Sequence, residues 1–270
     1  MSKTDRGIAL VTGASSGIGL ATAQALAQAG YQVFGTSRKP VADQPGITMR
    51  ICDVTDAASV KTLVDSIVRE AGTIDLLVNN AGIGLLGAAE ESSVAQAQRL
   101  FDVNVFGVAR VTNAVLPVMR ARKRGRIVNM SSILGLIPAP FNAFYAASKH
   151  AIEGYSESLD HEVREYGIRV VVVEPGLTRT AFEENLTRAD QPLAVYAAAR
   201  TRSENLMRMG VEAGDPPQVV ADVVLTAATA AKPKLRYAAG KQSSQVRALR
   251  RYLPEAMVDR SLRKFNGFTA

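Results

Sequence analysis

The feature that most constrains the fold is a glycine-rich turn between a predicted strand and a predicted helix. Residues 7–12 form a short apolar run, residues 12–19 read Thr-Gly-Ala-Ser-Ser-Gly-Ile-Gly, and an alanine-rich helical run extends from Leu20 to Ala29. Glycines let a backbone approach a pyrophosphate closely, and a helix N-terminus offers unpaired N–H groups to an anion. The strand, turn and helix together predict a nucleotide-binding site.

Strand-like and helical segments alternate along the rest of the chain. Further apolar strand-like runs are found at residues 31–36, 47–51, 74–78, 126–130, 168–174 and 235–238. This alternation favours a parallel sheet with helices on both faces. No repeat and no linker rich in proline or glycine divides the chain. We therefore predict one α/β domain built on a doubly wound parallel sheet, in three layers of α/β/α.

The net charge of +7 is concentrated near the carboxyl end. Residues 232–270 hold ten Lys/Arg and two acidic residues, a balance of +8, so the first 231 residues carry −1. This basic tail carries no recognised nucleic-acid motif, and we expect no nucleic-acid partner. No window of about 18 apolar residues and no signal peptide are found, which favours a cytoplasmic protein without a transmembrane segment. The single Cys52 excludes an intramolecular disulfide, and no metal site is expected.

The residues after the second predicted strand indicate which dinucleotide binds. Where NAD-binding folds carry an acidic residue, this chain has Ser37, Arg38 and Lys39. An arginine makes charge-assisted bonds to a 2′-phosphate that a carboxylate would repel, so we predict NADP(H). Asp53, at the end of the third predicted strand, is expected to meet the adenine, to cap the following helix at 57–70, or to do both.

A tyrosine and a lysine four residues apart form the predicted acid/base pair. Tyr145 and Lys149 lie in a predicted helix over 144–166, and this spacing places both side chains on one face. A free phenol has a pKa near 10, and a neighbouring cation is expected to lower it. The pair can then act as a general acid or base. Ser132 ends the fifth predicted strand and is expected to hold a substrate oxygen, with Ser131 as the alternative.

Residues of two neighbouring segments are expected to support this site. Asn104 lies within a predicted amphipathic helix over 94–120, where a buried amide without a partner would cost about 1–3 kcal/mol. Asn79, Asn80 and Gly82 follow the fourth predicted strand, at the edge where parallel sheets bind ligands. We expect them to stabilise backbone and to face the cofactor.

The last third of the chain holds two segments with no place in the sheet. Residues 181–214 have helical periodicity and several methionines, which suits a lid over a substrate pocket. Residues 241–268 show helical apolar spacing on a basic background. This extension is expected to pack on its own domain, with a partner subunit or an anionic membrane surface as alternatives.

Taken together, these motifs resemble the short-chain dehydrogenase/reductase family. The resemblance covers about residues 6–240 and rests on 12–19, 79–82, Asn104, Ser132, 145–149 and 175–180, in the family's order and spacing. It implies a Rossmann-type catalytic domain over 1–240 that binds NADP, a basic extension over 241–270, and a homodimer or homotetramer. The run Ser-Leu-Asp-His-Glu from Ser158 and the basic tail also resemble the 17β-hydroxysteroid-dehydrogenase-like branch. That likeness implies a bulky apolar ketone or secondary alcohol, steroid- or retinoid-like.

The resemblance also implies a role for each matched residue. Tyr145 is the general acid/base, Lys149 lowers its pKa and bonds the nicotinamide ribose, and Ser132 orients the substrate oxygen. Asn104 matches the family's helix-kinking asparagine. Thr180 and the backbone near Leu177 match residues that hold the carboxamide. The implied cofactor-binding set is Gly13, Ser15, Ser16, Gly17, Ile18, Gly19, Ser37, Arg38, Asp53, Val54, Asn80, Ala81, Gly82, Tyr145, Lys149, Pro175, Gly176, Leu177 and Thr180.

Three functions follow as expectations. The first is an NADP(H)-dependent oxidoreductase that interconverts a carbonyl and a secondary alcohol. The second is a 3-oxoacyl-thioester reductase, whose acidic substrate or carrier would suit a basic tail. The third, of another class, is a non-catalytic NADP(H) sensor on the same fold.

Overall fold

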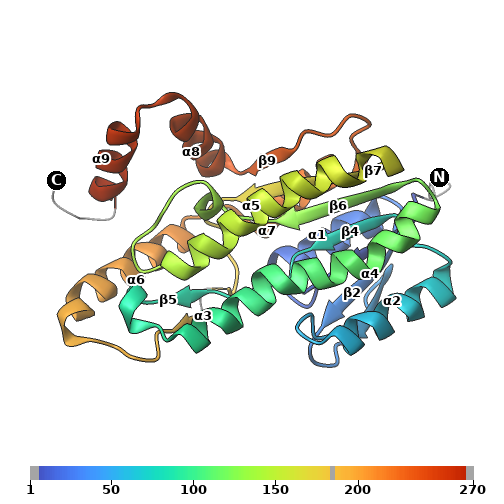
Figure 1. The fold of residues 1–270 in the computed structure, drawn as a ribbon, viewed down its shortest axis with the longest axis horizontal. Coiled ribbons are helices and arrows are strands. Elements are labelled where there is room, and N and C mark those ends of the chain that lie inside the picture. Colours follow the sequence, from blue (N-terminus) through green and yellow to red (C-terminus); the bar gives the residue numbers. More distant parts are fainter. Residues whose placement is uncertain (1–5, 183–185, 266–270) are drawn as a thin grey trace.

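A seven-stranded parallel sheet runs through the centre of the molecule (Figure 1). The computed structural model describes residues 6–182 and 186–265. The strand order is β3-β2-β1-β4-β6-β7-β9. The strands are β1 (Ile8–Val11), β2 (Gln32–Ser37), β3 (Ile47–Ile51), β4 (Leu76–Asn79), β6 (Gly125–Met130), β7 (Ile168–Pro175) and β9 (Arg236–Ala239). The order reverses between β1 and β4, and open α/β sheets bind ligands beyond the strand ends at such a point.

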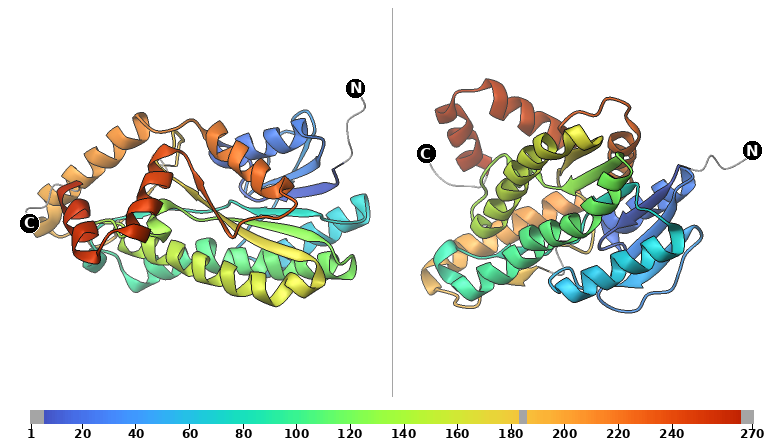
Figure 2. Two further views of the ribbon diagram at one scale, coloured as in Figure 1. Left: turned by 90° about the horizontal axis from the view of Figure 1, so that it is seen from above. Right: turned by 45° about the vertical axis from the view of Figure 1, so that its right-hand side comes forward.

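Helices cover both faces of this sheet and make the three-layer α/β/α arrangement (Figure 2). One core cluster joins α1 (Gly17–Gln28) and α7 (Pro217–Thr229) to one face. The other joins α2 (Ala57–Ala71), α4 (Val108–Ala121) and α5 (Ala143–Val163) to the opposite face. The predicted doubly wound single α/β domain is confirmed.

Local sequence explains the clearest helix boundaries. In α2 the Asp56 side chain accepts a hydrogen bond from the Ala58 N–H, and Gly72 ends the helix in the left-handed region with φ +77°. Between these caps Val60, Leu63, Val64 and Ile67 are buried, with the spacing of one helix face. Asp56 therefore caps α2, and the expectation that Asp53 does so is wrong.

The predicted helix over 94–120 is interrupted, which corrects the sequence interpretation. It consists of α3 (Val94–Phe101), a π-helical turn η2 (Asp102–Gly107) and α4. A π-helical turn bonds each N–H one residue further back than an α-helix does, and such turns are frequent at functional sites. Apolar periodicity does not reveal one wide turn, because the residues on both sides remain helical.

The remaining elements lie mostly beyond the carboxyl ends of the strands. The short strands β5 (Leu85–Leu86) and β8 (Thr187–Arg188) pair in parallel as a second sheet. Helix α6 (Ala197–Glu212) follows, and α8 (Lys241–Tyr252) and α9 (Glu255–Phe265) form the carboxyl-terminal extension (Figure 1). Short 3₁₀ turns are η1 (Ala89–Glu91), η3 (Ile133–Gly135), η4 (Arg164–Tyr166) and η5 (Ala194–Tyr196). The predicted lid and extension include residues 183–185 and 266–270, which lie outside the described residues.

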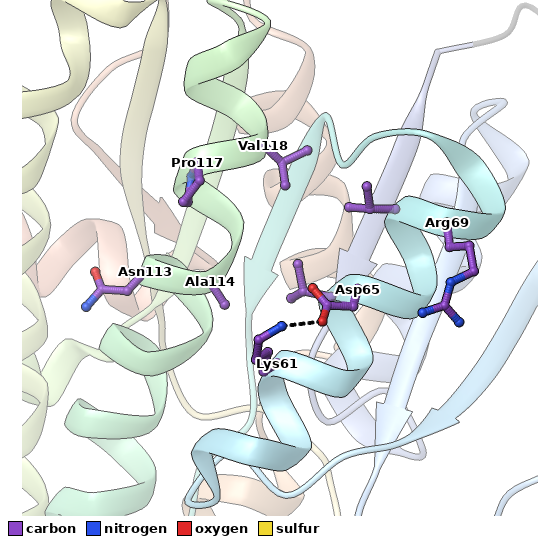
Figure 3. A pocket seen from close by; sticks show the side chains of 9 residues that line it. Lys61, Asp65, Arg69, Asn113, Ala114, Pro117 and Val118 are labelled. Carbon is purple, nitrogen blue, oxygen red and sulfur yellow. Dashed lines mark hydrogen bonds and ion pairs between the residues drawn. The ribbon is translucent and has the colours of Figure 1, made fainter.

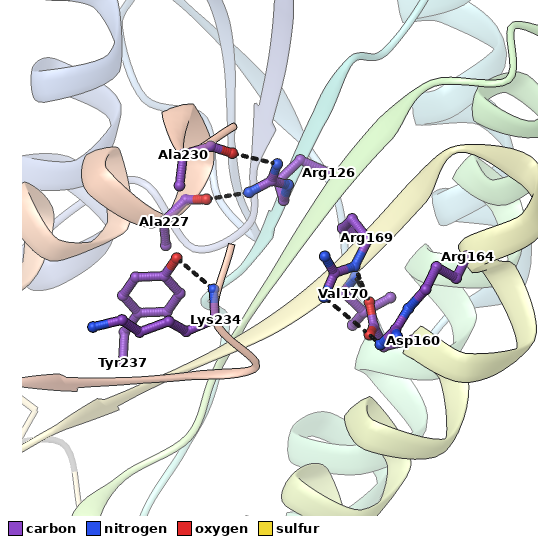
Figure 4. A network of polar contacts seen from close by, with 9 residues as sticks. All are labelled: Arg126, Asp160, Arg164, Arg169, Val170, Ala227, Ala230, Lys234 and Tyr237. Atoms are coloured by element: carbon purple, nitrogen blue, oxygen red, sulfur yellow. Dashed lines mark hydrogen bonds and ion pairs between the residues drawn. The ribbon is translucent and has the colours of Figure 1, made fainter. Parts of the chain in front are cut away.

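A buried aspartate ties the end of α5 to β7 (Figure 4). Asp160 is fully buried, and its Oδ1 accepts hydrogen bonds from Arg169 Nε at 2.9 Å and from the Val170 N–H at 2.8 Å. Arg164 also pairs with its Oδ2. Burial alone would raise the pKa of Asp160, but the hydrogen bonds from Arg169, Arg164 and Val170 hold it below the ordinary value.

Asp160→Ala is expected to lower the free energy of unfolding by about 2–3 kcal/mol, the range for hydrogen bonds to charged groups. The larger loss of stability that follows when a buried ion pair loses one partner is not expected here, because the side chains of Arg164 and Arg169 are partly exposed to water. Because the folded pKa is depressed, this contribution is present above the unfolded pKa near 3.9 and is lost as pH falls through the folded value. Urea unfolding at pH 7 measures the first effect, and a series from about pH 4 down to about pH 2 measures the second. Exposed Glu165→Ala is the control, and equal stability of the two variants would contradict the assignment.

Candidate active site

The glycine-rich turn builds a tight backbone cradle at the start of α1. Gly13 and Gly17 have φ +66° and +55°, a region that favours glycine. A Cβ added at Gly19 would lie 2.1 Å from the Gly13 carbonyl oxygen. Ser16 is the N-cap residue of α1, and its side chain makes no capping hydrogen bond within the described residues. The first N–H groups of α1 are therefore not capped by a serine, and the cradle fits a pyrophosphate.

The Asn-Asn-Ala-Gly segment after β4 is fastened to this cradle. The Asn80 amide Nδ2 donates to the carbonyls of Thr12 and Gly13, both at 3.0 Å. In return, Thr12 Oγ1 accepts from the backbone N–H groups of Asn80 and Ala81 at 3.0 Å. Asn80 thus stabilises the turn, whereas Asn79 is buried and donates to Asn129 Oδ1 at 2.8 Å. The two carboxamides hold β1, β4 and β6 in register at the edge where the site forms.

The ends of β2 and β3 bring the predicted cofactor-selecting residues together. Arg38 is exposed directly after β2, and its charge is one cause of the lowered pKa of Asp53. The larger causes are hydrogen bonds that Asp53 accepts from the Thr55 N–H and hydroxyl, at 2.9 and 2.7 Å. Val54 is buried, and its carbonyl accepts from Arg110 at 2.7 Å. An exposed guanidinium therefore lies close enough to the Asp53 carboxylate to favour its ionised form.

Asn104 lies in the π-helical turn and is satisfied on both sides of its amide. Its Oδ1 accepts from the Ile83 N–H at 2.9 Å, and its Nδ2 donates to the Ile83 carbonyl at 2.9 Å and to Ser148 Oγ at 3.2 Å. A Cβ added at Gly82 would lie 3.3 Å from Asn104 Oδ1 and 3.9 Å from Lys149 Nζ. The structure therefore places Asn104, Gly82 and Lys149 next to one another.

Tyr145, on α5, is hydrogen-bonded through its side chain to Ser132, which follows the end of β6. Burial raises the pKa of the Tyr145 phenol to about 12, and a hydrogen bond with Ser132 opposes this rise. Lys149 Nζ lies 5.6 Å from the centre of the phenol ring and donates to the Met130 carbonyl at 3.0 Å. The expectation of a lowered phenol pKa is wrong for this structure, because burial raises the pKa of Tyr145 by more than the hydrogen bond with Ser132 lowers it.

The neighbouring Ser131 is placed differently from Ser132. Its side chain is buried, and among the described residues its hydroxyl has no hydrogen-bond partner. A Cβ added at Gly135 would lie 2.5 Å from that hydroxyl. Ser132 is half-buried and accepts from the Leu134 N–H at 3.2 Å while facing Tyr145. Of the two serines left open by the sequence, Ser132 is the one at the phenol.

The segment after β7 reaches back to the start of α1. A Cβ added at Gly17 would lie 3.4 Å from the Thr180 side chain, so Thr180 lines the same cradle. Pro175 is buried and pairs with β9, and the Gly176 N–H donates to the Ala239 carbonyl at 3.1 Å. The Leu177 N–H donates to Gln242 Oε1 at 3.1 Å. The carboxyl-terminal extension therefore bonds the predicted cofactor segment directly.

The remaining predicted residues occupy the same edge of the sheet. Ser15 is exposed, Ile18, Ser37 and Ala81 are half-buried, and Gly82 lies between Asn104 and Lys149 as described above. Sequence reasoning missed Gln242 and the buried Glu153, which follows Lys149 by one helical turn. The four-residue spacing that linked Tyr145 to Lys149 also links Lys149 to Glu153, and that signal was in the sequence.

A hollow of about 520 Å³ lies between α2 and α4 (Figure 3). Its lining residues include Lys61, Asp65, Arg69, Asn113 and Pro117. None of the predicted site residues lines it, so it is not part of the site around Tyr145.

A family model described as short chain dehydrogenase matches residues 7–191. The chain belongs to the short-chain dehydrogenase/reductase family. This confirms the resemblance found in the motifs. Members of this family are oxidoreductases that use a nicotinamide cofactor, and the glycine cradle of this chain fits such a group.

Two relatives match over most of this short-chain dehydrogenase/reductase. The 3-ketodihydrosphingosine reductase of Bacteroides thetaiotaomicron is 38% identical over 264 residues, covering 96% of this chain and 97% of that protein. Retinol dehydrogenase 8 of Bos taurus is 37% identical over 251 residues, covering 84% and 79%. The similarity thus extends beyond the motifs into the segments around the cleft.

Solved structures of the family superpose on this short-chain dehydrogenase/reductase. A short-chain dehydrogenase from Streptomyces avermitilis has a TM-score of 0.83 at 33% identity, covering 99% of this chain and 98% of that one. A Burkholderia phymatum member in complex with NAD has a TM-score of 0.80 at 27% identity, covering 92% and 94%. A metagenomic member in complex with NADP has a TM-score of 0.70 at 28% identity, covering 88% and 98%. These likenesses support a nicotinamide cofactor without distinguishing its two forms.

Neither a membrane-spanning helix nor a metal-binding cluster is found in residues 6–182 and 186–265. No helix in these ranges is both long enough and apolar enough to cross a membrane. No group of three or more His, Cys, Asp or Glu side chains in the same ranges is arranged to hold a metal ion.

Proposed function

We propose that the protein is an NADP(H)-dependent oxidoreductase that interconverts an apolar ketone and its secondary alcohol. The observation that carries the proposal is the placement of Tyr145 between Ser132 and Lys149 at the edge that holds the glycine cradle. The cofactor supplies the hydride, and the protein supplies orientation and the proton.

Each side chain at the cleft has a proposed task. Ser132 holds the substrate oxygen by a hydrogen bond, which orients the carbonyl toward Tyr145. The phenol of Tyr145 carries its proton at neutral pH and is proposed to give it to the developing alkoxide, although burial, by raising the pKa of the phenol, makes it a weaker acid. Lys149 contributes a positive charge that favours the phenolate left behind. Asn104 fixes the Ile83 backbone on the opposite wall.

The proposed cofactor set combines the glycine cradle with the two flanking edges. Gly13, Gly17 and Gly19 are proposed to hold the pyrophosphate, and Thr180 to hold the carboxamide. Arg38 is proposed to bind the 2′-phosphate as an exposed guanidinium, and Asp53 the adenine. The charge at Arg38 supports NADP(H) over NAD(H).

Apolar walls around Tyr145 support a bulky apolar substrate. The Phe182 ring lies 5.9 Å from the Tyr145 ring, and a small apolar cluster of Leu86, Ala88 and Phe141 packs against Tyr196 and Met207 nearby. Residues 181–214 are proposed as the substrate lid, a wall of the catalytic domain over 1–240. The names of the two relatives, a 3-ketodihydrosphingosine reductase and a retinol dehydrogenase, agree with a lipid-like carbonyl or alcohol.

The lid is anchored to the domain by a buried carboxylate. Glu91 is fully buried, and it accepts from the Leu193 N–H at 2.8 Å and from the Ala88 N–H at 2.9 Å while pairing with Arg200. Burial opposes ionisation, but these hydrogen bonds hold the pKa of Glu91 below its ordinary value. Glu91 thereby fixes the proposed lid to the catalytic domain at Leu193 and Arg200.

A substrate panel tests the proposal. NADPH consumption is expected with 3-ketodihydrosphingosine or a rigid ketone of steroid size, and not with an acetoacetyl thioester. Turnover of the thioester alone would favour the 3-oxoacyl-thioester reductase, with the basic extension receiving an acidic carrier. NADPH binding without turnover of any ketone would favour the non-catalytic sensor. Light scattering on the same sample tests the proposed homodimer or homotetramer.

A further inference from the structure

Glu153 is a buried carboxylate one helical turn beyond Lys149. Both side chains are at least nine-tenths buried, and residues four apart on α5 lie on the same face. Glu153 Oε2 accepts from Arg236 Nε at 2.8 Å. Its other oxygen, Oε1, has no hydrogen-bond partner among the described residues. A buried carboxylate oxygen without a partner is costly, which calls for an explanation at this position.

Glu153 belongs to a cluster of three carboxylates and two guanidinium groups. Arg236, on β9, also lies 2.7 Å from Glu157 and 3.5 Å from Glu174. Arg247, on α8, lies 3.7 Å from the second oxygen of Glu174. We name these five residues the carboxylate cluster. These residues come from four elements, namely α5, β7, β9 and the extension helix α8.

Of the three carboxylates in the cluster, Glu174 interacts least with the Arg236 guanidinium. It is fully buried, and neither of its carboxylate oxygens has a hydrogen-bond partner among the described residues. Burial, followed by the negative charge of Glu153, raises the pKa of Glu174 to about 7 against the opposing effect of Arg247 and Arg236. Arg236 therefore serves mainly Glu153 and Glu157 at neutral pH, which fixes the Glu153 carboxylate on the face of α5 that also carries Lys149.

Lys149 needs a compensating charge in this environment. Its ammonium is buried and donates to the Met130 carbonyl at 3.0 Å. Burial lowers the pKa of Lys149 to about 8, and the charge of Glu153 opposes this fall. Without Glu153 a larger fraction of Lys149 would be neutral at pH 7–8.

We propose that Glu153 is a positioning residue for Lys149, whose buried carboxylate, fixed by Arg236, keeps the ammonium charged beside Tyr145. The catalytic consequence of this proposal rests on the proposed function. In that function a charged Lys149 favours the phenolate of Tyr145, and a neutral Lys149 does not. The charge interaction itself exists with or without turnover.

The first test follows Lys149 directly. In protein labelled with ¹⁵N-lysine, the Nζ resonance of Lys149, assigned by its loss in Lys149→Met, is titrated by NMR. Glu153→Gln is expected to lower the titration midpoint of Lys149 by about 1 unit or more, because an opposite charge favours the ammonium. Glu157→Gln, which removes the half-buried carboxylate on the same arginine, is expected to leave it unchanged. An unchanged midpoint in Glu153→Gln would overturn the proposal.

The second test uses the reciprocal interaction and serves if Glu153→Gln is too unstable for the titration. Urea unfolding measures the cost of Glu153→Gln in the unchanged protein and in Lys149→Met, and the cost is expected to be smaller in Lys149→Met, because the carboxylate there has no ammonium to favour. Equal costs in the two proteins would overturn the proposal. Both readouts are independent of turnover, so they separate this proposal from the proposed function.

For the active enzyme, the same substitution is expected to move the alkaline limb of kcat/KM to lower pH. At pH 8, Glu153→Gln is expected to lose about tenfold in kcat/KM, whereas at pH 6 it stays within about twofold, since Lys149 is charged in both proteins there. Glu153→Asp, which keeps the charge, is expected to restore most of the activity at pH 8. A loss of equal size at both pH values would indicate a purely structural role and would contradict the proposal.

Discussion

Tyr145→Phe is expected to lower turnover at least about 100-fold while NADPH binding is retained. Phenylalanine keeps the ring that contacts Phe182 but removes the hydroxyl that Ser132 bonds, so the developing alkoxide receives no proton. The measurement is kcat with the best ketone of the substrate panel, together with the dissociation constant of NADPH by fluorescence titration.

A matched control is available elsewhere on the chain. Tyr166 carries an exposed phenol in the turn after α5, and Tyr166→Phe removes the same hydroxyl far from Ser132. Its turnover should equal that of the unchanged protein. If Tyr145→Phe also keeps full turnover, Tyr145 is not the proton donor and the assignment fails.

Arg38→Asp is expected to reverse the preference between NADPH and NADH. The substitution replaces an exposed guanidinium by a carboxylate that repels the 2′-phosphate and can accept from a 2′-hydroxyl. The lost charge-assisted hydrogen bond corresponds to roughly 10–100-fold in NADPH affinity, and the repulsion adds to it. The ratio of kcat/KM for the two cofactors measures the change.

The neighbouring lysine separates local from general charge effects. Lys39→Asp makes the same change of charge one residue further on, also at an exposed position. It is expected to weaken NADPH binding far less than Arg38→Asp does. If Arg38→Asp still prefers NADPH, recognition of the phosphate lies elsewhere.

Sequence patterns predicted those parts of the site that depend on neighbours along the chain. The strand, turn and helix around residues 8–28 were predicted because their glycines and apolar residues are contiguous. The pairing of Tyr145 with Lys149 was predicted because both are on one helix. Local patterns also indicated where helices start. For α2, however, Asp53 and Asp56 are both plausible N-cap residues, and only the path of the folded backbone selects Asp56.

The parts that sequence patterns missed depend on residues brought together by folding. The bond from the Leu177 N–H to Gln242 joins positions 65 residues apart. The pKa of Tyr145 depends on how deeply α5 packs against β6, which a helical pattern does not contain. The raised pKa of Glu174 arises first from its burial and then from the negative charge of Glu153 on α5, against the opposing charges of Arg247 on α8 and Arg236 on β9.

The π-helical turn η2 limits how the chain length can vary. A π-helical turn contains one residue more than an α-helical turn, so losing a single residue from 102–107 would allow one continuous α-helix from 94 to 121. The side chains of α3 and α4 would keep their present faces, because the wide turn only accommodates the extra residue. The deletion would instead remove the wide turn that holds Asn104 against the Ile83 backbone and Ser148. Single-residue deletions here should be absent from functional descendants of this chain, whereas the exposed loop around residues 122–124 should accept them.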